Sequence, residues 1–220
     1  MCGIVGVVGN SNAVDILIQG LEKLEYRGYD SAGIYVTDAP DKGCLVKSVG
    51  RIADLRAKIS SDVKGSTGIG HTRWATHGQA TEDNAHPHTS ETGRFVLVHN
   101  GVIENYLQIK EEYLQGHKFK GQTDTEIAVH LIGKFVDEDG LSVLEALKKS
   151  LHIIQGSYAF ALVDSQAPDT IYVAKNKSPL LVGVGEGYNM VCSDAMAMIR
   201  ETSQFMEIHD KELVVLTKDA

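Results

Sequence analysis

The residue best placed for chemistry is Cys2, because it directly follows Met1. Removal of the initiator methionine would leave a cysteine with a free α-amino group beside its thiol. An α-amino group has a pKa of about 7.7–8, so roughly a third of it is neutral near pH 7.5. One residue would then provide both a nucleophile and a general base, as in enzymes that use an N-terminal threonine. Cys2 is therefore a candidate nucleophile, against the alternative of a chain that begins Met-Cys by chance.

Unusual side chains also gather in the segment H-T-R-W-A-T-H-G at residues 71–78, which holds the single tryptophan of the chain. The planar guanidinium of Arg73 is suited to binding a carboxylate through two parallel hydrogen bonds. Trp74 is suited to covering a bound ligand. The alternative places Arg73 in a surface ion pair and Trp74 in the core.

Five histidines raise the question of a metal site: His71, His77, His86, His88 and His99. The H-P-H step and the six-residue separation of the first two match no zinc-ligand spacing that is diagnostic. We therefore predict no metal site and no cofactor, and we expect these rings to make hydrogen bonds within loops.

The dipeptide Asn100-Gly101 follows a strand-like run. Asn-Gly is a hairpin-turn signal, because glycine tolerates a positive φ. In a functional interpretation, the Asn100 amide and the Gly101 N–H donate hydrogen bonds to a developing oxyanion. Loss of one such donor typically costs about 10²–10³ in rate. Both interpretations stay open at this point.

Two further motifs mark helix ends. T-D-T-E predicts a capping box with Thr123 as N-cap and Glu126 at the third helical position. Asp124 then lies in the first turn, where the helix dipole favours a carboxylate, and it is also suited to holding an ammonium group. After the first predicted helix comes R-G-Y-D-S, in which Gly28 is a helix stop or Arg27 positions the nucleophile.

Strand-like and helix-like segments alternate without a linker, which favours one α+β domain. Apolar residues at helical spacing predict helices near residues 12–24, 103–114, 125–135 and 141–151. Short apolar runs predict strands at residues 2–8, 32–36, 45–49, 68–71, 95–99, 158–164, 170–174, 180–184, 190–192 and 212–217. The polar stretch between residues 72 and 93 is predicted to be a long loop, a length typical of functional segments.

The composition is that of a soluble globular protein: 43% of the 220 residues are hydrophobic, 23% are charged and the formal net charge is −8. Nucleic-acid and anionic-membrane partners are disfavoured, because phosphate contacts need clustered positive charge. No apolar run approaches the length of a membrane span. Three widely separated cysteines without C-x-x-C spacing are typical of a reducing compartment, so a cytoplasmic protein is predicted.

Taken together, the motifs resemble one family, the glutaminase domains of glutamine–fructose-6-phosphate aminotransferases, also called glucosamine-6-phosphate synthases. The resemblance runs in order over essentially all 220 residues. It rests on C-G-I-V-G from Cys2, R-G-Y-D-S-A-G from Arg27, G-H-T-R-W-A-T-H-G from Gly70, N-A-H-P-H from Asn84, H-N-G from His99, T-D-T-E from Thr123, S-P-L-L-V-G from Ser178 and S-D-A-M-A-M from Ser193.

The resemblance implies an N-terminal-nucleophile hydrolase fold, a four-layer αββα sandwich of two antiparallel sheets, with residues 1–220 forming one type-2 glutamine amidotransferase domain. It implies that Cys2, freed of Met1, attacks the side-chain amide of L-glutamine and forms a thioester. Ammonia leaves, and hydrolysis of the thioester gives glutamate. The ammonia is destined for fructose 6-phosphate, to make glucosamine 6-phosphate in the full-length enzyme.

The resemblance also assigns site residues. Arg73 would bind the α-carboxylate of glutamine and Asp124 its α-ammonium, with Thr76 and His77 in the same pocket. The oxyanion hole would be formed by Asn100 and Gly101. Arg27 would support the cysteine end of the site, and Trp74 would belong to a loop that gates it.

The implied partner is a sugar-phosphate isomerase domain of the same polypeptide, which we expect to lie outside these 220 residues and through which a homodimer would form. Two alternatives remain. One is the glutaminase domain of a phosphoribosyl-type amidotransferase, which shares the N-terminal cysteine and the Asn-Gly step. The other is a non-enzymatic amino-acid-binding module, in which Met1 is never removed.

Overall fold

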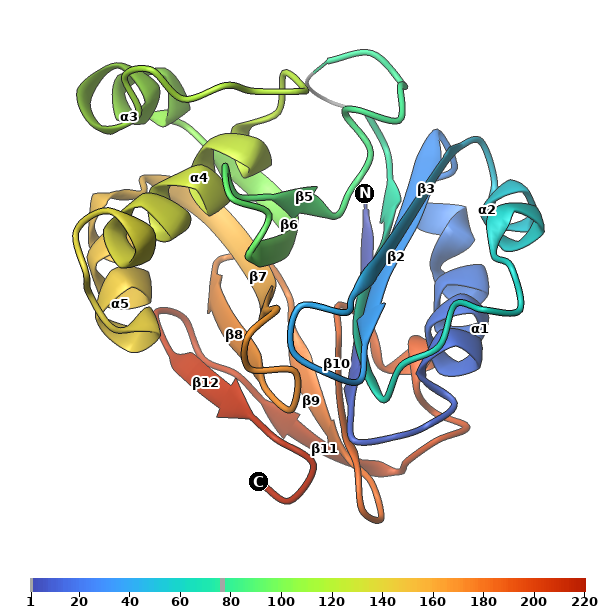
Figure 1. Ribbon diagram of the computed structural model, residues 1–220. Helices are drawn as coiled ribbons and strands as arrows, with labels where there is room; N and C mark the ends of the chain where they lie inside the picture. The colour runs from blue at the N-terminus through green and yellow to red at the C-terminus, as the bar shows by residue number, and fades with distance from the viewer. Residues whose placement is uncertain (1, 76–77) are drawn as a thin grey trace.

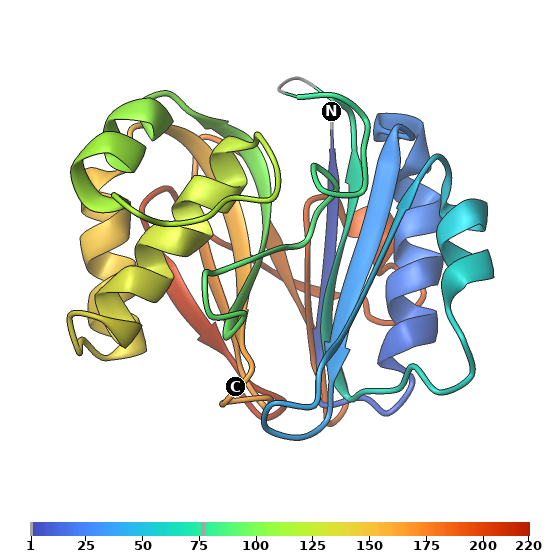
Figure 2. The same cartoon turned by 45° about the horizontal axis from the view of Figure 1, so that its top comes forward.

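Two antiparallel β-sheets pack face to face, and helices cover the outer side of each sheet (Figures 1 and 2). This computed structural model describes residues 2–75 and 78–220. The predicted α+β class and the four-layer αββα sandwich are confirmed.

The larger sheet has seven strands, and β1 lies in its interior. In spatial order the strands are β11 (Gln204–Glu207), β9 (Leu181–Val184), β10 (Asn189–Cys192), β1 (Gly3–Val8), β4 (Thr67–Arg73), β2 (Ser31–Thr37) and β3 (Cys44–Val49). Helices α1 (Ala13–Leu24) and α2 (Ile52–Lys58) cover its outer face.

The smaller sheet has five strands. In spatial order they are β12 (Leu213–Leu216), β8 (Ile171–Asn176), β7 (Gly156–Asp164), β6 (Phe95–Ile103) and β5 (His88–Thr89). Helices α3 (Tyr106–Tyr113), α4 (Asp124–Asp137) and α5 (Val143–Ile153) cover its outer face. Among the helices of the described residues, none is long and apolar enough to cross a membrane.

Strand β1 shows why the sequence begins with an unbroken apolar run. Val5 and Val7 pack into the core beneath α1, whereas Ile4 and Val8 belong to the core between the two sheets. Successive side chains of a strand point to opposite faces, so a strand buried between two layers must be apolar at every position. β1 is thereby fixed in the centre of the sandwich.

The pairing of β1 with β4 brings candidate site residues to one edge of the sandwich. The two strands are antiparallel, with Gly3 opposite Thr72. The start of β1, which follows Cys2, therefore meets the end of β4 at Arg73. Figure 1 shows the start of β1 and the end of β4 at this upper edge.

Most predicted helices and strands are present with ends shifted by less than one helical turn. Three elements were not predicted. Helix α2 is only two turns long, and the four side chains of β11 are all exposed and give no alternating pattern. Strand β5 has two residues and leaves no periodicity.

Of the two interpretations of Asn100-Gly101, the hairpin turn is wrong. Both residues lie inside β6 and pair with Ala159 and Tyr158 of β7. Gly101 has a φ of 131°, and a Cβ atom there would lie 2.2 Å from the Ser157 carbonyl oxygen. Glycine is therefore required by a close strand-to-strand approach within the sheet.

Candidate active site

Cys2 lies directly before β1, against the backbone of Trp74. The Trp74 N–H donates to the Cys2 Sγ atom at 3.2 Å, and the Trp74 carbonyl oxygen lies 3.6 Å from the same sulfur. Burial raises the pKa of the Cys2 thiol, although the Trp74 N–H and the positive charge of Arg73 oppose this effect. The thiol is therefore protonated at neutral pH and needs a base before it can attack.

The Asn100 side chain is held between Cys2 and a buried histidine. Its Nδ2 donates to the Cys2 carbonyl oxygen at 3.1 Å. The His71 Nε2 atom lies 2.9 Å from the Asn100 Oδ1 and 3.0 Å from the His99 carbonyl oxygen. Because Nε2 faces two oxygens, it carries the ring proton and donates to them. This network fixes which end of the Asn100 amide points toward Cys2.

Arg73 and Asp124 bring opposite charges to the same place, and both are buried, with 4% and 8% of their surface exposed. The Arg73 guanidinium donates to the Gln79 carbonyl at 3.1 Å. The Asp124 Oδ2 accepts from the Ile103 N–H at 2.8 Å. Burial lowers the pKa of Arg73, whereas the nearby charges of Cys2, Asp30 and Asp124 raise it. The site therefore combines a buried cation and a buried anion near one thiol.

These groups line one cavity of about 40 Å³, which Cys2, Arg73, Gly101 and Asp124 share with Trp74. Larger hollows exist, such as one of about 570 Å³ beside Arg94 and Asp137, but they do not include Cys2. Chemistry, and not size, singles out the small cavity. Because it is smaller than an amino acid, a substrate of that size requires movement of its walls.

The segment R-G-Y-D, residues 27–30, packs against the backbone of residues 73–75, which faces Cys2. The Asp30 carboxylate accepts from the Ala75 N–H at 2.7 Å, and the Tyr29 ring meets the Trp74 ring edge-on at a centroid distance of 5.5 Å. A Cβ atom on Gly28 would lie within 2.9 Å of the Arg73 and Trp74 backbone. Asp30 was missed as a site residue, although its place in R-G-Y-D was the available signal.

Arg27 lies outside the cavity and reaches the start of β1 through its neighbours. Its guanidinium pairs with Asp194 at 2.6 Å, and in the described part of the chain it is not among the residues that line the cavity. Next to Asp194, the Ser193 Oγ accepts from the Ile4 N–H at 2.9 Å. Arg27 thus braces the segment that holds the start of β1. Thr76 and His77 lie outside the described residues.

Four of the five candidate histidines form a buried layer beside the cavity. The His86 ring stacks on the His71 ring at 4.0 Å, and the His99 Nδ1 lies 2.9 Å from the Thr125 hydroxyl. The His88 Nε2 lies 2.9 Å from the hydroxyl of the α4 N-cap residue. Burial lowers the pKa of all four rings, that of His71 to about 3. The layer is therefore neutral at neutral pH.

Of the two hydrogen bonds predicted for the capping box at the start of α4, one is present. The Thr123 hydroxyl accepts from the Glu126 N–H, as predicted. The Glu126 carboxylate instead accepts from the N–H groups of Lys120 and Gly121, each at 2.8 Å. The loop before α4 folds back over the first turn, so these N–H groups replace the expected one. Asp124 remains in the first turn, as expected.

Comparisons with known proteins agree with this geometry. The model of the glutamine amidotransferase domain family matches residues 71–201. Relatives named glutamine–fructose-6-phosphate aminotransferase [isomerizing] from Streptococcus pyogenes serotype M1 and Streptococcus mutans serotype c are 85% and 84% identical over 219 residues. These alignments cover all of this chain, which spans 36% of the length of those relatives.

Two solved structures share the fold. A glutamine phosphoribosylpyrophosphate amidotransferase from Bacillus subtilis superposes with a TM-score of 0.85 at 29% identity, over 99% of this chain and 48% of that one. A structure described as the allosteric regulatory enzyme of purine biosynthesis gives 0.86 at 30% identity, over 99% and 47%. Motifs, fold and family match thus agree, and the chain belongs to the glutamine amidotransferase domain family.

Proposed function

We propose that this domain hydrolyses the side-chain amide of L-glutamine to glutamate and ammonia through a thioester on Cys2. The observation that carries the proposal is one small cavity lined by Cys2, by the buried charges of Arg73 and Asp124, and by Gly101. A zwitterion with an amide at its far end needs this combination of groups. The family match and the streptococcal relatives support the same reaction.

Substrate binding uses the two buried charges. The Arg73 fork takes the α-carboxylate of glutamine, and Asp124 takes the α-ammonium. Arg73 now donates to neutral carbonyl groups, among them that of Gln79. A carboxylate is a stronger partner, because charge-assisted hydrogen bonds are about twice as strong as neutral ones. Thr76 and His77 contribute to the same pocket, and Trp74 covers the bound substrate and gates ammonia passage.

Attack requires removal of Met1. The new α-amine of Cys2 accepts the thiol proton, directly or through water, as sulfur bonds to the amide carbon. The tetrahedral intermediate collapses as the C–N bond breaks, and the nitrogen leaves as ammonia with that proton. Water then hydrolyses the thioester, which releases glutamate and restores the thiol.

The oxyanion is held by donors from β6. The Asn100 Nδ2 carries two hydrogens, one of which donates to the Cys2 carbonyl oxygen. The N–H groups of His99 and Ile103 point to the His86 ring and to Asp124. The second donor would be the Gly101 N–H, because Gly101 lines the cavity beside Cys2. Arg27 acts indirectly, by bracing the start of β1.

We further propose that the domain works within a longer, cytoplasmic polypeptide and sends its ammonia to a sugar-phosphate isomerase domain. There it would convert fructose 6-phosphate to glucosamine 6-phosphate, with a homodimer formed through that domain. The name of the 80–85% identical relatives supports this acceptor. The structural similarity at about 30% identity favours a phosphoribosyl acceptor as the second candidate. The net charge of −8 argues against nucleic-acid and anionic-membrane partners.

Intact mass and glutamate release, measured on one sample, test the proposal. We expect a protein lacking Met1 that releases glutamate from glutamine. Cys2→Ala should lower that rate by more than about 10³-fold, because it removes the nucleophile. Cys44→Ala is the matched control and should keep it. Glutamate release that persists in Cys2→Ala would contradict the proposal, and binding of glutamine without hydrolysis would indicate a non-enzymatic module.

A further inference from the structure

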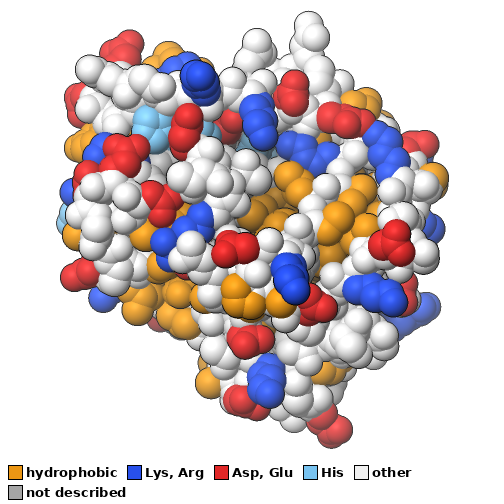
Figure 3. Space-filling view, in the orientation of Figure 1, with side chains coloured by type: hydrophobic (Ala, Val, Ile, Leu, Met, Phe, Trp, Pro, Cys, Tyr) orange, Lys and Arg blue, Asp and Glu red, His pale blue; other side chains and the backbone are white. Residues whose placement is uncertain are grey.

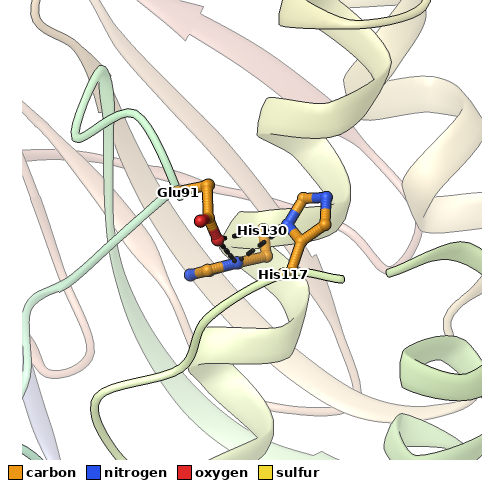
Figure 4. A group of neighbouring side chains, drawn as sticks. All are labelled: Glu91, His117 and His130. Carbon is orange, nitrogen blue, oxygen red and sulfur yellow. Dashed lines mark hydrogen bonds and ion pairs between the residues drawn. The ribbon is translucent and has the colours of Figure 1, made fainter. Parts of the chain in front are cut away.

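Away from the cavity, three metal-ligating side chains from three separate segments point toward one another (Figure 4). Glu91 lies in the turn between β5 and β6, His117 in the loop after α3, and His130 in the middle of α4. The Nδ1 atoms of the two histidines are 3.2 Å apart. The Glu91 Oε2 lies 3.6 Å from the first of them and 3.5 Å from the second.

These separations fit the ligand atoms of a small metal ion. A tetrahedral Zn²⁺ ion about 2.1 Å from nitrogen and oxygen ligands holds them about 3.4 Å apart. The three distances, 3.2, 3.5 and 3.6 Å, lie on either side of this value. Two histidines and one glutamate also form a ligand set that zinc uses in proteins, with water as the fourth ligand.

The surrounding groups orient the ligands. The His117 Nε2 lies 3.0 Å from the Glu138 Oε1, so this nitrogen carries the proton and the Nδ1 lone pair faces the cluster. A carboxylate that holds the far nitrogen of a ligating histidine is a common second contact in zinc sites. The Lys118 N–H donates to the Glu91 Oε2 at 2.9 Å and fixes that oxygen. Burial lowers the pKa of His130 to about 4, so the ring is neutral at neutral pH.

Glu91 is the most exposed of the three ligands. The side chains of His117 and His130 are 8% and 3% exposed, whereas that of Glu91 is 40% exposed. Figure 3 shows histidine atoms at the surface near α4, among acidic and basic side chains. The Phe119 ring covers the His130 ring at a centroid distance of 4.6 Å. Solvent can therefore reach the site from the Glu91 side and supply a water ligand.

We propose that Glu91, His117 and His130 bind a divalent transition-metal ion, with Zn²⁺ the best match to the ligand set. The ion would join the β5–β6 turn, the loop before α4 and α4 itself. That loop leads directly to Asp124, so the ion would stabilise the segment that positions this carboxylate. The sequence predicted no metal site, on the spacing of five other histidines; His117 and His130, thirteen residues apart, were not among the candidates.

Zinc titration against a chromophoric chelator tests this proposal. The protein is used in a Cys2→Ala background, because an N-terminal aminothiol would itself chelate zinc, and any affinity tag is removed. We expect one Zn²⁺ per chain and a higher unfolding temperature with the ion bound. Because this variant hydrolyses nothing, the outcome is independent of the proposed glutaminase reaction.

Variants locate the site. Glu91→Gln and His117→Gln should each weaken zinc binding at least tenfold, and Glu138→Gln roughly 10–100-fold through loss of the orienting contact. His152→Gln, which removes an exposed histidine elsewhere, is the matched control and should bind as the parent does. Circular dichroism of each variant shows that it is folded. Absence of stoichiometric zinc, or equal affinity in His117→Gln and His152→Gln, would overturn the proposal and leave a hydrogen-bonded histidine pair.

Discussion

Two groups of buried histidines lie along α4, and their surroundings differ. In the first group, formed by His71, His86, His88 and His99 near the start of the helix, the rings meet hydroxyl, amide and carbonyl groups. In the second group, formed by His117 and His130, two ring nitrogens face each other beside carboxylates. Each ring of the first group has a hydrogen-bond partner on at least one nitrogen, although the His71 Nδ1 is buried without one among the described residues. In the second group two ring nitrogens and a carboxylate oxygen converge on one point. The ring environment, and not the number of histidines, separates a positioning layer from a candidate metal site.

The largest expected effect is at Asn100, the side chain that a ring of the first group orients. His71 orients the Asn100 amide, so Asn100→Ala should lower kcat for glutamine hydrolysis by about 10²–10³, the cost of losing one oxyanion donor. KM should change little, because the amide does not hold the zwitterionic end. Steady-state kinetics measures both. Asn105→Ala removes an asparagine that bonds to the Ile153 carbonyl outside the cavity, and it should keep kcat. A fall of less than tenfold in Asn100→Ala would argue against the oxyanion role.

The next largest effect is expected on KM for glutamine, from loss of the Arg73 charge beside the first group. Arg73→Ala should raise KM for glutamine by about 10–150-fold, because a charge-assisted contact contributes roughly 1.5–3 kcal/mol. Arg73→Lys keeps the charge but loses the fork, so an intermediate KM is expected. Arg56→Ala, which breaks an exposed pair with Glu22, is the control. A KM within twofold of the parent in Arg73→Ala would remove Arg73 from the substrate site.

Both groups should make the fold sensitive to acid. Burial lowers the pKa of His71 to about 3 and that of His130 to about 4, whereas an unfolded histidine titrates near 6.5. Below pH 6.5 the unfolded chain therefore binds protons that the folded chain does not. The free energy of unfolding should fall by about 1.4 kcal/mol per pH unit for each such ring until its folded pKa is reached.

Urea denaturation at pH 7.5, 6.5 and 5.5 measures this slope. His130→Gln should reduce the slope by about one proton, whereas His152→Gln, at an exposed position, should leave it unchanged. Equal slopes in the parent and in His130→Gln would mean that the ring is already charged in the folded protein.

Local patterns predicted the α+β class, whereas the four-layer sandwich was predicted from the resemblance to a family. Arg73 and Asp124 were found from side-chain chemistry and a helix-start motif, and the structure brings both to the Cys2 cavity. The hairpin at Asn100-Gly101 was wrong, because a long-range pairing with β7 decides the conformation of that dipeptide. Asp30 was missed, because its contact with the Ala75 N–H crosses 45 residues.

The second histidine group could not be predicted for the same reason. Glu91, His117 and His130 come from a turn, a loop and a helix, and only tertiary packing makes them neighbours. Conversely, the spacing of His86 and His88 drew attention to rings that the fold supplies with hydroxyl partners. Spacing along the chain indicates a metal site only where the ligands share one local element.

The smallest effect is expected for His86→Gln, in which the zinc affinity should not change. If the two groups differ as their contacts indicate, His86→Gln should leave zinc binding within about twofold of the parent, whereas His117→Gln weakens it at least tenfold. The His86 Nδ1 accepts from the His99 N–H, and its Nε2 lies 3.5 Å from the Thr125 hydroxyl, so neither nitrogen faces a carboxylate. The measurement is the same chelator competition, in the Cys2→Ala background. Loss of zinc in His86→Gln would place the ion in the first group, where coordination would then replace the hydrogen bonds of His86.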